Sequence, residues 1–212
     1  MAKDLLWHGA QYEGERLDVA TIDADPMAQF RRWYKDAEAT GGRNINAMTL
    51  ATADATGRPS ARIVLLKELD DRGFVFFTNY ESHKAEQLAA NPRAALVFYW
   101  GKLDRQVRVE GAVEKVDDAS SAAYFDVRPL QSRIGALASP QSRVIASREA
   151  LEARVQEIAA VVGERPKRPD NWGGYRVIPD ELEFWQGQPS RLHDRIRYRM
   201  IDGGWQLDRL AP

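Results

Sequence analysis

Residues 47–78 read AMTLATADATGRPSARIVLLKELDDRGFVFFT, and their pattern sets the expected fold class. Three segments of this stretch are rich in the β-branched and aromatic residues that strands prefer: residues 47–53, 61–66 and 74–78. The TGRP at 56–59 and the DDRG at 70–73 have the composition of tight turns. Because strands joined by short turns pair antiparallel, the stretch predicts the start of an antiparallel sheet.

The strand signature recurs further along the chain, at residues 94–100, 106–116, 175–178, 182–186, 195–201 and 205–209. Helices are expected at about residues 118–127, 129–137 and 148–162. Ser147 is the expected N-cap of the last of these helices, and Ser82 that of a short helix ending before Asn91-Pro92. Some nine short strands with clustered helices predict an α+β antiparallel barrel, without the strand–helix alternation of a Rossmann fold.

The N-terminal side of the sheet begins with a helix. Asp25-Pro26 is a typical helix start, with Asp as N-cap and Pro at the first helical position, and Gly41-Gly42 is the expected stop. Residues 1–24 have weak periodicity and are interpreted as a mobile segment and a candidate active-site flap. Residues 25–212 are interpreted as a single domain.

Composition excludes several classes of protein. The 212 residues include 44% apolar residues, 30 Lys+Arg, 31 Asp+Glu and no cysteine, which fits a soluble globular chain without disulfides or thiolate chemistry. No run approaches the roughly 18 apolar residues of a membrane span, and no secretory signal is evident, so a cytoplasmic location is expected. The net charge of −1 argues against nucleic-acid binding, which depends on neutralising phosphates.

Arginine outnumbers lysine by 23 to 7, and residues 128–154 carry a net charge of +3 where residues 1–30 carry −4. The guanidinium fork suits phosphates and carboxylates, so this excess is consistent with an anionic ligand. Codon bias in a GC-rich genome is the simpler explanation, and composition alone favours it.

Familiar site motifs are absent from the sequence: it has no GxGxxG after a strand, no GxxxxGK[ST] and no HExxH. The three histidines, His8, His83 and His193, and the lack of cysteine leave no ordinary zinc ligand set, so no metal is expected.

Donors suited to phosphate recur near the ends of the predicted strands. Arg62-Ile-Val-Leu-Leu-Lys67 is an apolar strand between two cations, and residues 78–84 run from a strand into a helix start carrying hydroxyls and Lys84. Gln141-Ser142-Arg143 precedes another helix start, and helix N-termini favour anions. A surface edge strand and ordinary helix capping remain alternative interpretations.

Tyr124, Arg128 and Ser132 are spaced four apart, so on one continuous helix they would share a face and could share a phosphate. Pro129 breaks that helix, and the arrangement then requires a tight bend. A surface arginine beside a buried tyrosine is the alternative.

Residues 185–195, WQGQPSRLHDR, form the most unusual segment. If this segment is extended, Arg191, His193 and Arg195 project to one face. Two guanidiniums beside an imidazole lower its pKa unless an anion lies among them. The segment therefore favours a site next to Trp185, with a solvated edge strand as the alternative.

Taken together, these segments resemble the pyridoxine/pyridoxamine 5′-phosphate oxidase family over about residues 25–212. An ordered set of motifs carries the resemblance: RIVLLK at 62–67, RQVRVEG at 105–111, SPQSR at 139–143, WGGY at 172–175, EFWQG at 183–187, RLHDR at 191–195 and DRLAP at 208–212. It implies a split-barrel FMN-binding fold and a homodimer with FMN at the interface. It also implies oxidation of pyridoxamine or pyridoxine 5′-phosphate to pyridoxal 5′-phosphate, with O2 as acceptor and H2O2 as product.

The resemblance further implies which residues form the site. The FMN-binding set would be Arg62, Ile63, Val64, Leu65, Leu66, Lys67, Phe77, Thr78, His83, Lys84, Gln106, Gln141, Ser142, Trp185 and Arg195. The substrate phosphate would be bound by Lys67, Tyr124, Arg128 and Ser132. Arg191 and His193 would contact the pyridine ring as the catalytic pair, orienting the substrate for hydride transfer.

Four positions depart from the family pattern. His83 stands where the family usually has Arg, Asn44 replaces an acidic residue, Leu137 replaces Trp, and Tyr12 lacks its accompanying Arg. Because an imidazole charge depends on pH, His83 predicts weaker FMN retention as pH rises. Two other functions stay open: another split-barrel flavin reductase, and a non-catalytic protein that binds flavin or pyridoxal phosphate.

Overall fold

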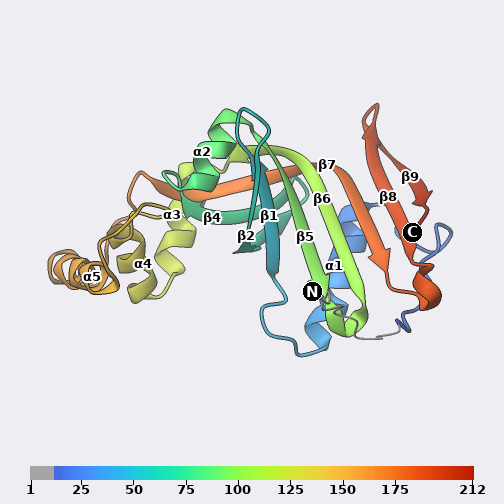
Figure 1. Ribbon diagram of the computed structural model, residues 1–212, viewed down its shortest axis with the longest axis horizontal. Coiled ribbons are helices and arrows are strands. Elements are labelled where there is room, and N and C mark those ends of the chain that lie inside the picture. The colour runs from blue at the N-terminus through green and yellow to red at the C-terminus, as the bar shows by residue number, and fades with distance from the viewer. Residues whose placement is uncertain (1–11) are drawn as a thin grey trace, which may run out of the picture. The chain divides into compact units, whose positions relative to one another are not determined.

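The computed structural model describes residues 12–212, and Figure 1 shows the order of the elements. The strands are β1 (Ala47–Ala53), β2 (Pro59–Leu65), β3 (Glu68–Asp70), β4 (Gly73–Asn79), β5 (Arg93–Trp100), β6 (Arg105–Lys115), β7 (Trp172–Gln186), β8 (Asp194–Ile201) and β9 (Gly204–Leu210). The helices are α1 (Pro26–Ala39), α2 (His83–Ala90), α3 (Asp118–Val127), α4 (Leu130–Ala138) and α5 (Arg148–Val162), with 3-10 turns η1 (Gly101–Leu103) and η2 (Pro189–Arg191).

The strands of the described residues form one sheet. Seven follow the order β2-β1-β5-β6-β7-β4-β3, and β8 pairs with β7 on one side and with β9 on the other. The β1–β2, β3–β4, β4–β7, β7–β8 and β8–β9 pairs are antiparallel. The predicted antiparallel α+β class is therefore confirmed.

Two of the three predicted helix caps are confirmed. The Asp25 carboxylate accepts a hydrogen bond from the Met27 N–H, with Pro26 as the first helical residue, and the Ser147 hydroxyl accepts from the Ala150 N–H. Ser82 occupies the N-cap position of α2, but the prediction that its side chain caps the helix is wrong. Its hydroxyl donates instead to the Asn79 carbonyl, 2.7 Å away. No helix in residues 12–212 is long and apolar enough to cross a membrane.

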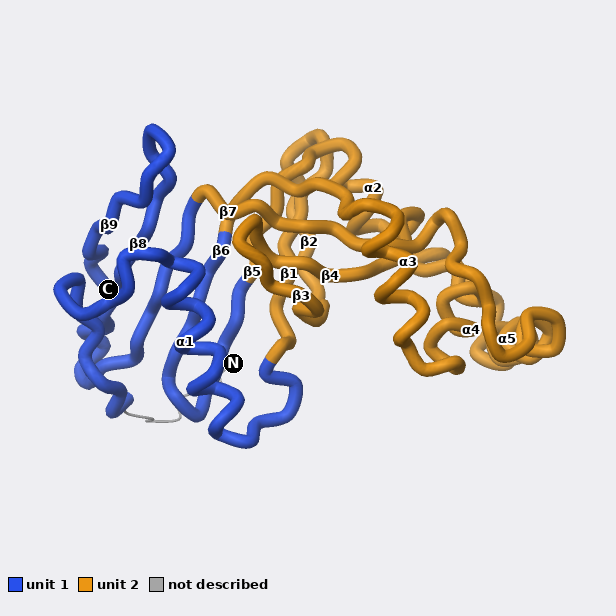
Figure 2. The backbone as a smooth tube through the Cα atoms, turned by 180° about the vertical axis from the view of Figure 1, so that it is seen from behind, with its two compact units in different colours: residues 1–45, 97–109, 181–212 blue, residues 46–96, 110–180 orange. Residues whose placement is uncertain are grey.

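The described residues fall into two compact units, coloured separately in Figure 2. Unit 1 contains residues 12–45, 97–109 and 181–212, and unit 2 contains residues 46–96 and 110–180. In unit 1, the buried Phe30 and Trp33 of α1 contact Phe98 and Phe184, with ring centroids 4.9 and 5.2 Å apart respectively. In unit 2, β4 is buried along nearly its whole length.

Strand β7 is continuous where the sequence predicts two strands, 175–178 and 182–186, so that prediction is wrong in this respect. Pro179, which lacks an N–H group, suggests an interruption. In the structure β7 pairs with β4 up to Val177 and with β8 from Glu181, so Pro179 lies where the strand changes partner. The short strand β3 was not predicted, because three residues give too little pattern.

The N-terminal segment is described only from residue 12, so residues 1–11 of the predicted flap lie outside the described residues. Leu17 and Ile22 are buried, and the Leu17 N–H donates to the Asp194 carboxylate at 3.0 Å. Mobility and a flap role for residues 1–24, and a single domain over 25–212, stay predictions.

Gly111 of β6 gives a test of how closely β7 is packed in unit 2. A Cβ atom at Gly111 would lie 1.9 Å from the Ile178 carbonyl oxygen, whereas a Cβ at Gly135 of α4 would meet nothing within 4 Å. We expect Gly111→Ala to lower the free energy of unfolding by about 2 kcal/mol or more, because backbone must move. Gly135→Ala should raise it by about 0.5–1 kcal/mol through helix propensity. Urea denaturation of both variants checks this, and equal stability of Gly111→Ala and the parent chain would refute it.

Candidate functional site

A pocket of about 900 Å³ lies in unit 2, lined by residues of β2, β4, α2, α3 and α4 and of the segment that follows α4. It brings together most of the predicted site residues: Arg62, Ile63, Val64, Leu65, Lys67, Phe77, Thr78, His83, Lys84, Tyr124, Arg128, Ser132, Gln141 and Ser142. Four Lys or Arg side chains line it, and none of the described Asp or Glu residues does. In a chain of net charge −1, this pocket is built for anions.

Lys84, in the first turn of α2, is the most constrained cation of the pocket. Its Nζ donates to the Thr78 and Ser82 hydroxyls at 3.1 and 3.2 Å and to Gln141 Oε1 at 3.1 Å. The residue is only 8% exposed, and no described carboxylate forms an ion pair with it. Burial, with a smaller contribution from the nearby Arg62 charge, lowers the pKa of Lys84 to about 8. A buried ammonium with only neutral partners is poised to accept a ligand's negative charge.

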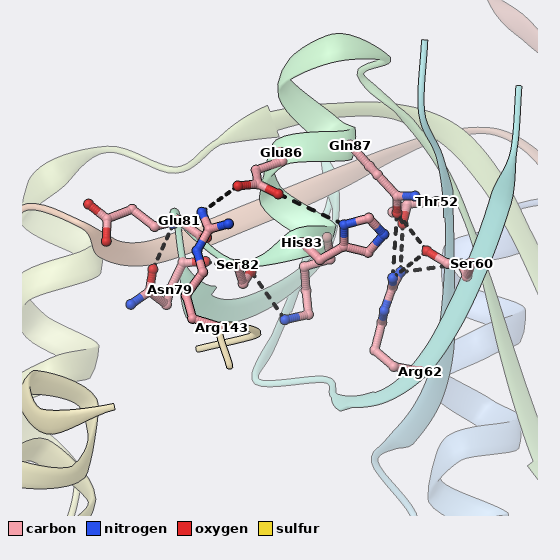
Figure 3. Close-up of polar contacts among 11 residues, drawn as sticks. Thr52, Ser60, Arg62, Asn79, Glu81, Ser82, His83, Glu86, Gln87 and Arg143 are labelled. Carbon is pink, nitrogen blue, oxygen red and sulfur yellow. Dashed lines mark hydrogen bonds and ion pairs between the residues drawn. The ribbon is translucent and has the colours of Figure 1, made fainter. Parts of the chain in front are cut away.

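Arg62 of β2 is held by neutral groups alone (Figure 3). One guanidinium nitrogen donates to the Thr52 hydroxyl at 2.6 Å and to the Leu50 carbonyl at 3.3 Å. The other donates to the Ser60 hydroxyl at 2.6 Å and to Gln87 Oε1 at 3.5 Å. Burial lowers the pKa of Arg62, yet an arginine keeps its proton in proteins. Its orientation is fixed and its positive charge is not neutralised by these contacts.

A second donor group is built around Arg128, which follows the last residue of α3. Its guanidinium lies over the Trp172 ring at 4.6 Å, and its buried Nη1 has no hydrogen-bond partner among the described residues. Burial lowers the pKa of Arg128. An orphaned buried donor is rare in native structures, and a bound acceptor would satisfy it.

Tyr124, Arg128 and Ser132 line the same pocket although α3 ends at Val127 and α4 begins at Leu130. Pro129 is the N-cap of α4, so the chain bends there tightly enough to keep the three side chains on one pocket. Tyr124 stacks on Phe77 with ring centroids 4.1 Å apart, which fixes the tyrosine ring. Lys67 Nζ lies 6.0 Å from the Tyr124 ring centroid.

Not every residue predicted for the cofactor lines this pocket. Leu66 is buried and outside the lining, because side chains alternate along β2 and its continuation, and its N–H donates to the Asn46 carbonyl at 2.8 Å. Gln106, Trp185, Arg191, His193 and Arg195 belong to unit 1.

Residues 191–195 are not extended throughout, so the condition for a shared face of Arg191, His193 and Arg195 is not met. Arg191 ends the 3-10 turn η2 with a left-handed φ of 61°, preceded by Ser190 at 57°, and only residues from Asp194 onward are in β8. The turn begins at Pro189, whose fixed φ favours a turn over a strand. Arg191, His193 and Arg195 therefore do not share one face of a strand.

His193 lies in an aromatic cluster within unit 1. Its ring is 4.6 Å from the Trp185 ring and 5.2 Å from the Tyr12 ring, measured between centroids. Its Nδ1 accepts a hydrogen bond from the Gln188 N–H at 3.0 Å, so the neutral ring carries its proton on Nε2. Burial, and secondarily the Arg191 charge, lowers the pKa of His193 and favours this neutral form.

Arg195 is paired with a buried carboxylate. Its Nε and Nη2 donate to the two oxygens of Glu183 at 2.8 and 3.0 Å, and the Glu183 side chain is 4% exposed. Sequence reasoning missed Glu183. In the structure Glu183 of β7 and Arg195 of β8 lie on paired strands, in which Trp185 is the register partner of Arg195. It also missed Trp172, Thr52, Ser60 and Gln87, because only the folded sheet and helices bring them to the cations.

The donor set fits FMN. A phosphate monoester needs charge-assisted donors, and Arg62 and Lys84 supply two cations beside the hydroxyls of Thr78 and Ser142. Because Lys84 is buried without a counter-ion, an anion from outside would relieve its desolvation cost. Within the described residues, no cluster of His, Asp and Glu could hold a metal ion.

Comparison with solved structures supports this fold. PhzG from Burkholderia lata 383, solved in complex with tetrahydrophenazine-1-carboxylic acid, superimposes with a TM-score of 0.88 at 30% identity, covering 94% of this chain and 99% of PhzG. A pyridoxamine 5′-phosphate oxidase-related, FMN-binding protein from Nostoc punctiforme has a TM-score of 0.70 at 18% identity, with 90% and 100% covered, which supports the fold alone. The fold and the cation-lined pocket define a split-barrel flavoprotein with FMN as its cofactor.

Sequence comparison identifies the family within that class. Residues 35–162 match the family described as pyridoxamine 5′-phosphate oxidase, and residues 172–212 match the pyridoxine 5′-phosphate oxidase C-terminal dimerisation region. Pyridoxine/pyridoxamine 5′-phosphate oxidase of Ralstonia pickettii is 59% identical over 202 residues, 95% of each chain. The Cupriavidus necator protein of the same name is 61% identical over 197 residues, covering 92% of this chain and 93% of its own. The chain belongs to the pyridoxine/pyridoxamine 5′-phosphate oxidase family, and it is an oxidoreductase.

The Lys84 environment predicts that FMN affinity depends on pH. A bound phosphate stabilises the charged ammonium, so above pH of about 8, where Lys84 of the apoprotein is neutral, binding must take up a proton. We expect FMN affinity to fall as pH rises above about 8. In Lys84→Met this fall should disappear, and affinity at pH of about 7 should drop by about tenfold or more.

Fluorescence titration of the apoprotein with FMN across pH measures both effects, with the exposed Lys167→Met as control. Because the folded-state pKa of Lys84 lies below its ordinary value, apoprotein stability should rise with pH above about 8. The Lys84→Met apoprotein should therefore be at least as stable as the parent near neutral pH. A large loss of apoprotein stability in this variant would show that Lys84 is structural.

Proposed function

We propose that this chain oxidises pyridoxamine 5′-phosphate and pyridoxine 5′-phosphate to pyridoxal 5′-phosphate in an FMN-dependent reaction, with O2 as acceptor. The products would be H2O2 and, from the amine, NH3. The observation that carries the proposal is the pocket itself, with four cations in two donor groups and no described carboxylate in its lining. Two groups of donors suit two phosphates, one on the cofactor and one on the substrate.

The first donor group, Arg62, Thr78, Lys84, Gln141 and Ser142, would hold the FMN phosphate and ribityl chain. When bound, the flavin would supply the redox chemistry, as the acceptor at N5 of a hydride from substrate C4′. Residues 63–65 of β2, which also line the pocket, would run beside the cofactor. Gln106, Trp185 and Arg195 of unit 1 are proposed as further flavin contacts.

The second donor group, Lys67, Tyr124, Arg128 and Ser132, would bind the substrate phosphate. The orphaned Arg128 Nη1 supports this assignment, because a phosphate oxygen is the acceptor it lacks. Arg191 and His193 are proposed to orient the pyridine ring, with neutral His193 donating from Nε2. Fixing the ring for hydride transfer is a positioning task, which these residues perform without acting as nucleophiles.

The proposal includes a homodimer with FMN at the subunit interface and a cytoplasmic location. The match of residues 172–212 to a dimerisation region supports the dimer. Edge strand β2, with Ile63 65% exposed and Leu65 38% exposed, presents apolar side chains that a second subunit would cover. The low net charge supports small-molecule partners over nucleic acid.

A direct assay tests the function and the role of Arg191. The purified protein should show flavin absorbance and, with pyridoxamine 5′-phosphate in air, form equal amounts of H2O2 and pyridoxal 5′-phosphate. Arg191→Ala should keep FMN and lower kcat/KM by about a hundredfold or more, because ring orientation is lost. Arg199→Ala, an arginine of β8 paired with Asp208, is a matched control that should stay active. Flavin binding without any product would favour a storage protein instead.

His83 should limit FMN retention. It lines the pocket, and its Nδ1 lies 3.8 Å from the Glu86 carboxylate on a side chain that is 57% exposed. A guanidinium presents a fixed charge and a fork of donors to a phosphate, which an imidazole does not. We expect His83→Arg to tighten FMN binding, measured by fluorescence titration. Identical affinities of the variant and the parent at every pH would contradict this role.

A further inference from the structure

The segment of residues 139–147 joins α4 to α5, and it has little support from the core of unit 2. Residues 141–147 are all exposed, and Val144 is completely so. Ser142 adopts a left-handed φ of 70°, a conformation that is unfavourable for a residue with a side chain. A segment of this kind keeps one conformation only where specific contacts hold it.

The same segment contributes two residues to the pocket. Gln141 Oε1 accepts hydrogen bonds from the Thr78 hydroxyl at 2.9 Å and from Lys84 Nζ at 3.1 Å, and Ser142 lies beside it in the lining. Part of the proposed FMN-phosphate site is therefore carried by backbone that the core does not fix.

Arg143 provides the second attachment of the segment, and it lies outside the pocket lining (Figure 3). Its Nη2 donates to Glu86 Oε1 at 2.5 Å and to the Glu81 carbonyl at 3.1 Å. Glu86 is in the first turn of α2, and its other carboxylate oxygen lies 3.8 Å from His83 Nδ1. One carboxylate thus joins the segment to the helix that carries His83 and Lys84.

We propose that the Arg143–Glu86 ion pair holds the 139–147 segment against α2 and sets the rate at which FMN enters and leaves the pocket. With the pair closed, Gln141 and Ser142 are held against Thr78 and Lys84. When the pair opens, the segment keeps the Gln141 contacts and the hydrogen bond from Arg143 to the Glu81 carbonyl, and the strained Ser142 backbone can relax. Arg143 is a positioning residue in this scheme, and the inference rests on the proposed placement of the FMN phosphate at Lys84.

The size of the effect follows from the exposure of the pair. The side chains of Arg143 and Glu86 are 54% and 47% exposed, and such ion pairs are screened by solvent and salt. We expect FMN to dissociate about three- to fivefold faster from Arg143→Ala and from Glu86→Gln. The double variant Arg143→Ala/Glu86→Gln should be no faster than Arg143→Ala, because Arg143→Ala alone already removes the ion pair.

Release of FMN from the holoprotein, followed by flavin fluorescence on dilution, measures these rates without any turnover. Arg148→Ala is the matched control, since Arg148 forms an exposed 2.7 Å pair with Glu152 in α5, away from the pocket lining. Its release rate should equal that of the parent chain, and thermal unfolding of all the apoproteins should be unchanged. The acceleration in Arg143→Ala should shrink as salt is added, because the parent pair is itself screened.

An unchanged rate of FMN release from Arg143→Ala, or an equal acceleration in Arg148→Ala, would refute this role of the ion pair while leaving the proposed function intact. Strictly additive effects in the double variant would overturn it as well. Failure of the parent chain to bind FMN at all would instead refute the proposed function, and with it the role of the ion pair in FMN release.

Discussion

The burial of an ammonium group without a counter-ion is the constraint on which the site depends. Lys84 Nζ is surrounded by Thr78, Ser82 and Gln141 oxygens, all neutral, and it lies near Arg62, whose own contacts are also neutral. Taking charge out of water in this way costs folding free energy that an acidic side chain would ordinarily offset. No described acidic side chain lines the pocket to offset this cost, so the pocket is suited to an anion from outside.

The surrounding architecture explains how this charge is held in place. Thr78 and Lys84 flank the short connection between β4 and α2, so strand and helix must keep a fixed geometry. Strand β4 is paired with β7, which approaches so closely that Gly73 and Gly111 have no room for a Cβ beside Val177 and Ile178. Glycine at these two positions is therefore part of how the sheet positions the cation.

The second donor group shows a different solution to the same problem. Arg128 is fixed by aromatic faces, lying 4.6 Å from the Trp172 ring, and Tyr124 is fixed by stacking on Phe77. These contacts orient the donors and use none of the hydrogen-bonding capacity that a phosphate needs. In unit 1, by contrast, Arg195 is bound by Glu183, so its charge is already neutralised within the protein.

The sequence by itself determined the antiparallel α+β class, the caps at Asp25 and Ser147, and most of the pocket lining, because strand composition and cap chemistry are local. The helix start after residues 141–143 and the family motifs both indicated Gln141 and Ser142, but no local pattern predicts that they share a pocket with Lys84. Only the tertiary structure decided that Pro129 bends the chain without separating Tyr124 from Ser132, and that β7 passes through Pro179 by changing partner. It also decided that residues 189–191 turn, and that Ser82 binds Lys84 where a cap was expected. The shared pocket and the partner change of β7 depend on residues distant in sequence, and pairing across such distances is set by packing.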